Sequence, residues 1–251
     1  MQLDTNKGMD VTGSIIIEDR YCGPVGMGNG GYICGLLAGF MDGPLSVSLR
    51  APAPLDTSLD IQLIGNGVEA RFGDALIATA SPAPDPVDRA VPVIPDVASC
   101  LQASSAFFVE PDEMYRQCFV CGKDRGADAL HIHAGPLQGE AEGVGPDIVA
   151  ATWQPDADFA GDDGRVRPEI VWAALDCPGY FACSTGERSL LARMQATVFA
   201  PVNMGETYRV IGWNMDSGKA AGRKRRAATA LIAPDDSVVA AARQIWVVLK
   251  S

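Results

Sequence analysis

The sequence predicts an α+β fold built from two similar units, each of which packs one helix on an antiparallel sheet. An internal repeat is the first observation: residues 53–65 align without gaps with residues 200–212, and Ala, Pro, Ile and Gly are identical between them. The second observation is the order of patterns. An apolar helix candidate, at residues 30–41 and again at residues 168–177, precedes each copy, and strand patterns follow. One helix on one sheet, twice over, explains both observations.

A proline-rich stretch separates the two halves. Residues 81–96 contain five prolines and little apolar periodicity, which is typical of a linker, and residues 97–108 follow as a short predicted helix. We therefore expect a first unit over residues 1–81, a linker with a short helix over residues 82–117, and a second unit over residues 118–251.

Strand patterns fill much of the second half. They include residues 130–135 and 147–155 before the helix, and residues 225–233 and 237–249 after it. The last two are joined by Pro-Asp-Asp-Ser, which is a good reverse turn. This order predicts an antiparallel sheet around the second helix, as in the first half.

Composition places the chain among globular proteins. Its 251 residues are 47% hydrophobic, 20% charged and 7% aromatic, which excludes a disordered, collagen-like or coiled-coil chain. The formal net charge of −11 disfavours binding to nucleic acid or to an anionic membrane. The apolar runs are shorter than the roughly 20 residues of a membrane span, and the N-terminus lacks the pattern of a signal peptide, so we expect a cytoplasmic protein. Seven irregularly spaced cysteines favour reduced thiols over a disulfide framework.

Three features of the sequence resemble a known fold family. Asn29-Gly30-Gly31-Tyr32 opens the first apolar helix, an Ala-Pro turn joins a strand pair in each half, and the segment CFVCGKDRGADALHI begins at Cys118. In this order the features resemble the hotdog fold, in which a curved antiparallel sheet wraps one central helix, and more narrowly the double-hotdog acyl-CoA thioesterases. The segment at Cys118 looks like a lead-in of thioesterases of the phenylacetate-degradation type. The resemblance implies a double hotdog that hydrolyses an acyl-CoA thioester.

The first half keeps one part of the motif that this resemblance implies. In the single-domain relatives, a His-Gly-Gly opens the central helix, its glycine N–H groups bind the thioester carbonyl, and an acid nine residues after the His acts across the interface. A helix start suits this task because its N–H groups have no partner within the helix and carry partial positive charge. In this chain Gly30 and Gly31 match the two glycines of the motif, and Asn29 replaces the His as an expected substrate contact. The position nine residues after Asn29 is Ala38, which cannot do acid–base chemistry.

The second half keeps the complementary part. Arg167, Pro168 and Glu169 replace the motif at the helix start, and Pro168 has no N–H to offer an oxyanion. Asp176, nine residues after Arg167, stands where the acid belongs. We therefore expect one composite site per chain, in which the two glycine amides of the first helix face Asp176 as general base or nucleophile. The mirror-image site is expected to be inactive.

Structural and functional alternatives stay open for these residues. Asp176 precedes Cys177-Pro178, where a helix must end or bend, so its carboxylate could simply bond to backbone. Asn29 could be only a helix N-cap. An acyl-CoA-binding protein without turnover is the main functional alternative, because each half has lost part of the motif. A hotdog dehydratase or hydratase is less favoured, since those relatives use a catalytic His and both histidines of this chain lie outside the central helices.

A C-x-x-C pair is the one candidate for a metal site. Cys118 and Cys121 form the pair, and His131 and His133 follow on a predicted strand, so that these four residues could bind zinc. Their spacing is not that of a zinc finger. We therefore expect neither a metal nor another cofactor.

A basic cluster stands out in this acidic chain, with five Lys and Arg at residues 218–226. Arg223, Lys224 and Arg226 are the candidates to bind the phosphates of a CoA nucleotide. The alternative is a solvated turn that protects a sheet edge. Unpaired sheet edges on each unit also predict a homodimer of the chain.

Overall fold

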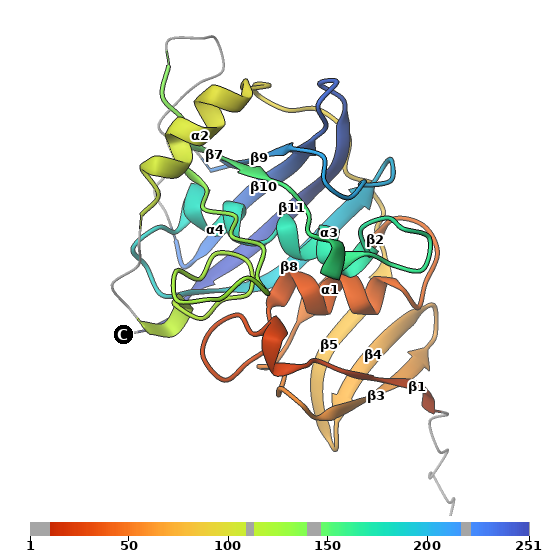
Figure 1. The fold of residues 1–251 in the computed structure, drawn as a ribbon. Helices are drawn as coiled ribbons and strands as arrows, with labels where there is room; N and C mark the ends of the chain where they lie inside the picture. The colour runs from red at the N-terminus through yellow and green to blue at the C-terminus, as the bar shows by residue number, and fades with distance from the viewer. Residues whose placement is uncertain (1–10, 109–112, 140–146, 217–221, 251) are drawn as a thin grey trace, which may run out of the picture.

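The structure is a computed structural model that describes residues 11–108, 113–139, 147–216 and 222–250 (Figure 1). Its strands are β1 (Val11–Ile16), β2 (Leu45–Leu49), β3 (Ser58–Ile64), β4 (Gly67–Phe72), β5 (Ala75–Pro82), β6 (Gly135–Pro136), β7 (Ile148–Trp153), β8 (Ser189–Val198), β9 (Tyr208–Asn214), β10 (Lys224–Ile232) and β11 (Val238–Val248). Its helices are α1 (Gly30–Ala38), α2 (Val97–Ser105), α3 (Pro168–Ala174) and α4 (Cys177–Cys183), with 3₁₀ turns at Asp19–Tyr21, Glu113–Tyr115 and Ala157–Phe159. None of the helices within the described ranges is long and apolar enough to cross a membrane.

The strands form one antiparallel sheet in which two units share one strand order. Outward from the middle of the sheet, the first unit has β2, β5, β4, β3 and β1, and the second has β8, β11, β10, β9 and β7 in the matching places. The units join where β2 pairs with β8. The repeated Ala-Pro segments lie before β3 and β9, which are equivalent strands. The predicted α+β fold with a duplicated unit is confirmed, while borders between the units at residues 82 and 118 stay a prediction.

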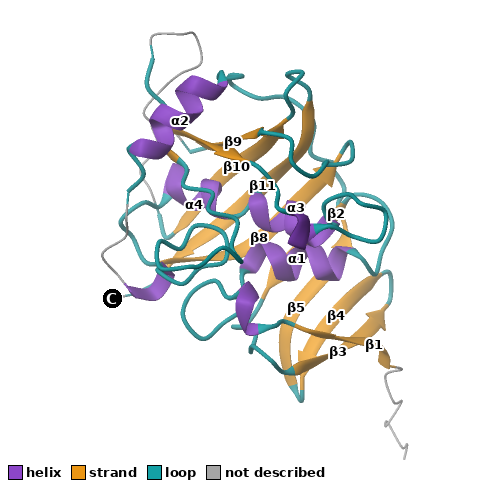
Figure 2. Cartoon of the chain, viewed as in Figure 1, coloured by secondary structure: helices purple, strands orange, loops and turns teal. Residues whose placement is uncertain are grey.

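Two central helices, α1 and α3, lie side by side on one face of the sheet (Figure 1, Figure 2). Asn29 begins α1, and its side-chain oxygen accepts a backbone N–H of the first turn at 2.9 Å. The helices run antiparallel and pack closely because α1 has glycines at the contact. A Cβ added at Gly31 would lie 2.8 Å from the carbonyl oxygen of Trp172, and one at Gly35 would lie 2.5 Å from the Cα of Glu169.

A proline interrupts the second central helix and places a carboxylate at the break. Pro178 has no N–H and its ring conflicts with the preceding turn, so α3 ends at Ala174 with Leu175 as its C-cap, and α4 begins at Cys177 after Asp176. The carbonyl oxygen of Leu175 accepts hydrogen bonds from Thr229 Oγ1 at 2.9 Å and from Gln244 Nε2 at 2.5 Å. Side chains of β10 and β11 thus satisfy the backbone at the break and fix the position of the carboxylate.

The sheet of the second unit is covered on both faces. The helices α3 and α4 cover one face. On the other face, Val87 of the proline-rich stretch and Cys100 and Ala103 of α2 pack against Ile211 and Ala230. Strands that are buried on both faces are continuous apolar runs, which explains why β10 and β11 show little polar alternation. The proline-rich stretch therefore packs as part of a second core instead of running free.

The strand predicted at residues 130–135 is wrong apart from the first residue of β6. Leu130 and Ile132 donate backbone hydrogen bonds to the carbonyl oxygens of Phe119 and Val120, so this stretch folds back on the segment before it. His131 has a φ of +52°, which an extended strand does not allow. The two histidines therefore do not alternate along a strand.

Candidate active site

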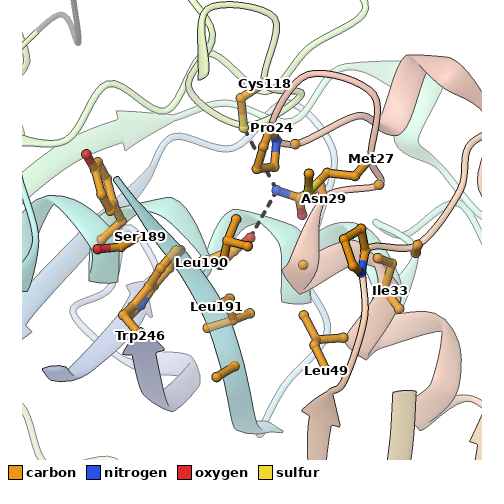
Figure 3. A pocket seen from close by; sticks show the side chains of 18 of the residues that line it. Pro24, Met27, Asn29, Ile33, Leu49, Cys118, Ser189, Leu190, Leu191 and Trp246 are labelled. Carbon is orange, nitrogen blue, oxygen red and sulfur yellow. Dashed lines mark hydrogen bonds between the residues drawn. The ribbon is translucent and has the colours of Figure 1, made fainter. Parts of the chain in front are cut away.

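A cavity of about 320 Å³ lies where the two units meet (Figure 3). The loop before α1 and the end of β2 form its wall on the first unit, and β8, β11 and the start of α4 form its wall on the second. Its apolar lining includes Met27, Ile33, Leu49, Leu191 and Trp246. Asn29, Gly30 and Asp176 add polar groups to this lining. An apolar cavity with a few convergent polar groups is the usual form of a small-molecule site.

The carboxylate of Asp176 lies directly against the start of α1. Its Oδ2 accepts the backbone N–H of Gly31 at 2.9 Å and the side-chain amide of Asn29 at 3.0 Å. Its Oδ1 has no hydrogen-bond partner within the described ranges, and the residue is only 2% exposed. Two donors therefore hold one carboxylate oxygen, and the other has no partner among the described residues.

Burial raises the pKa of Asp176 to about 7, because the charged form loses its hydration inside the protein. The N–H of Gly31 and the amide of Asn29 act in the opposite direction, since both donate to the carboxylate. The site thus combines a buried acid with a helix start, as the spacing of the two motifs predicts.

This contact corrects the predicted role of the two glycines. We expected the N–H groups of both Gly30 and Gly31 to be uncovered, but that of Gly31 is already bonded to Asp176. The N–H of Gly30 has no acceptor among the residues that the structure describes, and Gly30 lines the cavity. Of the two glycine amides at this helix start, that of Gly30 is therefore the one without an acceptor. Asn29 is 2% exposed, caps α1 and holds Asp176, so its geometry is that of an N-cap and positioning residue.

The mirror-image helix start has a different structure. Pro168 is the first residue of α3, and Arg167 and Glu169 form an ion pair at 3.1 Å. Arg167 also donates to the hydroxyl of Tyr21 at 2.9 Å. Glu169 is therefore paired with Arg167, and neither Glu169 nor Ala38 lines the cavity.

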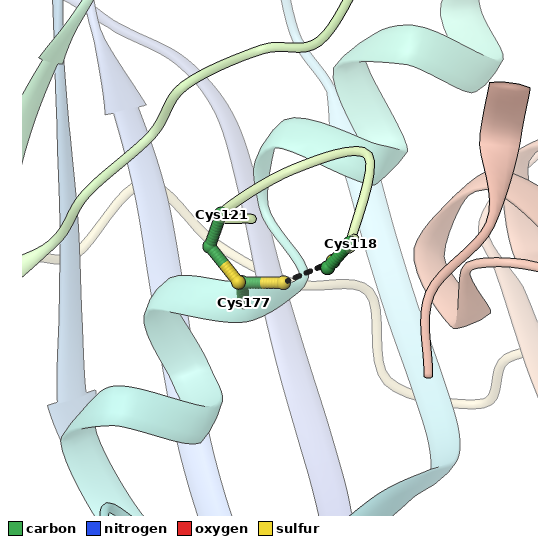
Figure 4. Close-up of side chains that lie close together, drawn as sticks. All are labelled: Cys118, Cys121 and Cys177. Atoms are coloured by element: carbon green, nitrogen blue, oxygen red, sulfur yellow. Dashed lines mark hydrogen bonds between the residues drawn. The ribbon is translucent and has the colours of Figure 1, made fainter. Parts of the chain in front are cut away.

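Three cysteines lie together beside the composite site (Figure 4). The Sγ atoms of Cys118, Cys121 and Cys177 all lie within 4.8 Å of one another. Hydrogen bonds from the other two thiols and from backbone N–H groups hold the pKa of Cys118 well below its usual range. His131 and His133 are not members of this group, and the Nε2 of His131 bonds to a backbone carbonyl. The predicted set of two cysteines and two histidines therefore does not form. Sequence analysis did not identify Cys177 as a member of the group, and its position next to Asp176 was the only indication that it lies near the site.

The basic cluster lies at the start of β10, next to the strand β11 that lines the cavity, and none of its described basic residues is itself part of the lining. Lys224 pairs in register with a residue of β11 that lines the cavity, and Arg223 donates to a carbonyl at the end of β11 at 3.0 Å. Both side chains are exposed and make no ion pair within the described ranges. Arg226 is instead held by Asp216, which accepts from its side chain and its backbone N–H. Residues 217–221 of the cluster lie outside the described residues.

Comparisons with known proteins give matches in fold. No model of a protein family matches the sequence, and no curated protein is significantly similar to it. The tesB protein of Mycobacterium avium subspecies paratuberculosis matches with a TM-score of 0.59 and 14% identity, over 97% of this chain and 96% of that one. A thioesterase superfamily protein matches over 53% of this chain and 61% of its own, with 20% identity and a TM-score of 0.45. The E. coli PaaI protein of the phenylacetic acid degradation operon matches over 42% and 75%, with 13% identity and a TM-score of 0.38.

The match to the tesB protein spans nearly the whole of both chains, so it includes both helix-on-sheet units. The strand order of the two halves agrees with this match, since each half has the same five strands in the same places. The predicted fold is therefore confirmed, and this chain is a double hotdog.

Proposed function

We propose that the chain hydrolyses an acyl-CoA thioester at the composite site between α1 and the α3–α4 break. The observation that carries the proposal is the arrangement of Asp176. Two donors hold one of its carboxylate oxygens, and the other oxygen has no partner among the described residues. Asp176 lines the apolar cavity together with Gly30, whose N–H is unbonded. Thioester hydrolysis needs a base or nucleophile, a donor for the oxyanion and a dry place for the acyl chain.

In the proposed reaction, the acyl chain occupies the cavity and the thioester carbonyl accepts the N–H of Gly30. The Oδ1 of Asp176 either takes a proton from a water that attacks the carbonyl carbon, or attacks that carbon itself to form an anhydride that water then hydrolyses. In both routes the C–S bond breaks, and the thiolate leaves and takes up a proton. The products are a carboxylic acid and the thiol of CoA. Gly31 and Asn29 orient the carboxylate.

The basic residues at the start of β10 suit the nucleotide part of CoA. Arg223 and Lys224 are exposed next to β11, a strand that lines the cavity, in a chain whose net charge is −11. Phosphate groups bind such local pairs of cations through charge-assisted hydrogen bonds. This placement supports CoA, rather than a short thiol, as the leaving group.

A protein that binds acyl-CoA without turnover is the second candidate. One observation favours it: Asp176 uses the N–H of Gly31, so one amide fewer is left for the oxyanion. Loss of a single oxyanion donor typically lowers the rate by about 100- to 1,000-fold. A slow or inactive chain would therefore fit the same geometry.

The test is release of free thiol from a panel of acyl-CoAs, with calorimetric binding of the same ligands. Asp176→Asn keeps the shape of the side chain, and its amide oxygen can accept both existing hydrogen bonds, so we expect binding to persist. Turnover is expected to fall by at least about 100-fold because the base or nucleophile is lost. Glu169→Gln is the control, since it changes a carboxylate of the mirror-image start outside the cavity.

Full turnover by Asp176→Asn would refute the proposed role of the carboxylate. A wild-type chain that binds acyl-CoA and releases no thiol from any member of the panel would support the binding protein instead. Label in the Asp176 carboxylate after a single turnover in ¹⁸O-labelled water would identify the nucleophilic route, because it enters there only if water attacks the Asp176 carbonyl carbon of an anhydride.

A further inference from the structure

Three thiols from two distant segments converge beside the cavity (Figure 4). Cys118 and Cys121 come from the segment before β6, and Cys177 is the first residue of α4. All three are free and buried. The sulfur atoms of Cys118 and Cys177 are 3.6 Å apart, and all three sulfur atoms lie within 4.8 Å of one another. The proposed hydrolysis uses none of them.

The backbone around Cys118 forms a tight turn. The N–H of Gly122 donates to the carbonyl oxygen of Cys118 at 2.8 Å. A Cβ added at Gly122 would lie 2.6 Å from backbone atoms of Cys118, so the turn needs glycine at this place. The turn therefore fixes Cys118 and Cys121 close together, as a shared metal ion requires.

The spacing of the sulfur atoms fits a tetrahedral metal ion. Zinc–sulfur bonds are about 2.3 Å long, so two thiolates on one tetrahedral zinc lie about 3.8 Å apart. The distance of 3.6 Å between Cys118 and Cys177 is close to this value, and no pair exceeds it by more than about 1 Å. All three cysteines also line the cavity, so a fourth ligand position would open toward it. Thiolates prefer zinc-class ions to the hard ions Mg²⁺ and Ca²⁺.

We propose that Cys118, Cys121 and Cys177 bind one zinc-class divalent ion, with the fourth position open to the cavity. The ion joins the segment before β6 to the α3–α4 break, at the residue after Asp176. Cys177 takes the place of the two histidines that the sequence offered as partners of the C-x-x-C pair, because the fold brings its sulfur to the other two.

The test measures metal in the reduced chain without substrate, so its outcome is independent of hydrolysis. The full chain, kept in a phosphine reductant, is titrated with Zn²⁺ against a chromophoric chelator and, separately, with Co²⁺. We expect about one zinc per chain and a sulfur-to-cobalt charge-transfer band with the intensity of three thiolates.

Cys177→Ser and Cys183→Ser form a matched pair of variants. Both replace a thiol of α4, but Cys183 lies outside the cluster. We expect Cys177→Ser to lower the affinity for zinc by at least about 100-fold and to weaken the charge-transfer band, and Cys183→Ser to match wild type. Far-ultraviolet circular dichroism checks folding, and Cys121→Ser replaces Cys177→Ser if the latter does not fold. A reduced wild-type chain that binds no zinc, or a folded Cys177→Ser chain that binds it as tightly as wild type, overturns the proposal.

Discussion

Replacement of Gly31 by alanine tests the close approach of α1 and α3 at the composite site. The added Cβ would lie 2.6 Å from the Cβ of Asp176 and 2.8 Å from the carbonyl oxygen of Trp172. Ordinary contacts between carbon atoms are about 3.5–4.0 Å, so the helix break that holds Asp176 must move away by about 1 Å.

Two opposing effects set the size of the change in stability. Crowding in a packed core costs about 1–3 kcal/mol. Alanine is favoured over glycine within a helix by at most about 1 kcal/mol. We therefore expect Gly31→Ala to lower the free energy of unfolding by roughly 1–2 kcal/mol. The shift of Asp176 by about 1 Å is expected to lower kcat for thiol release by about 100-fold, because a reacting group out of position loses most of its benefit.

Gly35→Ala is the matched control for this variant. Its Cβ would lie 2.5 Å from the Cα of Glu169, so it crowds the same helix pair one turn away from Asp176. Urea unfolding should report a similar loss of stability for both variants, whereas kcat should fall much further in Gly31→Ala. Gly39→Ala is less crowded, since its Cβ would lie 3.3 Å from the carbonyl oxygen of Leu36 within the first central helix, and it should change both quantities much less. Equal losses of kcat in the two crowded variants would refute the reasoning, as would unchanged stability in both.

Two further experiments test other parts of the site. Asn29→Ala removes the cap of α1 and one of the two donors to the carboxylate, so we expect urea unfolding to show a loss of about 1 kcal/mol and thiol release to slow; unchanged values of both would contradict the assigned contacts. The double change Arg223→Ala and Lys224→Ala should raise the KM for a CoA thioester but not for a thioester that lacks the nucleotide, whereas Arg226→Ala should change neither, because Asp216 already holds that guanidinium. Equal effects on both thioesters would show that the cluster supports the fold rather than phosphate binding.

Local patterns predicted most of the elements that carry the site. The apolar run after Asn29 forms α1, and the run after Asp96 forms α2. In both cases the side chain before the helix caps its first turn, so the signal lies within a few residues of the boundary. The repeat also identified β3 and β9 as equivalent, because duplicated units keep their strand order.

Contacts between distant segments could not be predicted in the same way. A helix start has free N–H groups, which is why Gly31 was expected to be uncovered, but its acceptor on Asp176 lies 145 residues away in the sequence. The third thiol, Cys177, joins the C-x-x-C pair only through the fold. His131 adopts a positive φ that no propensity for strand indicates. In each case the packing of distant segments determines the contact or the backbone conformation, and local sequence periodicity contains no information about it.

The difference between the two helix starts follows from the register of α1 against α3. In the aligned motifs, Gly31 corresponds to Glu169 and Gly35 to Ala173. The contacts are crossed: a Cβ at Gly31 would lie 3.1 Å from the Cα of Ala173, and one at Gly35 would lie 2.5 Å from the Cα of Glu169. The helices are thus related by an approximate two-fold axis. The position nine residues after the start of each motif, Ala38 in one half and Asp176 in the other, therefore faces the start of the other helix. Because close approach needs glycine on only one of two facing helices, a chain that contains both helices can place the glycines on one and Asp176 on the other.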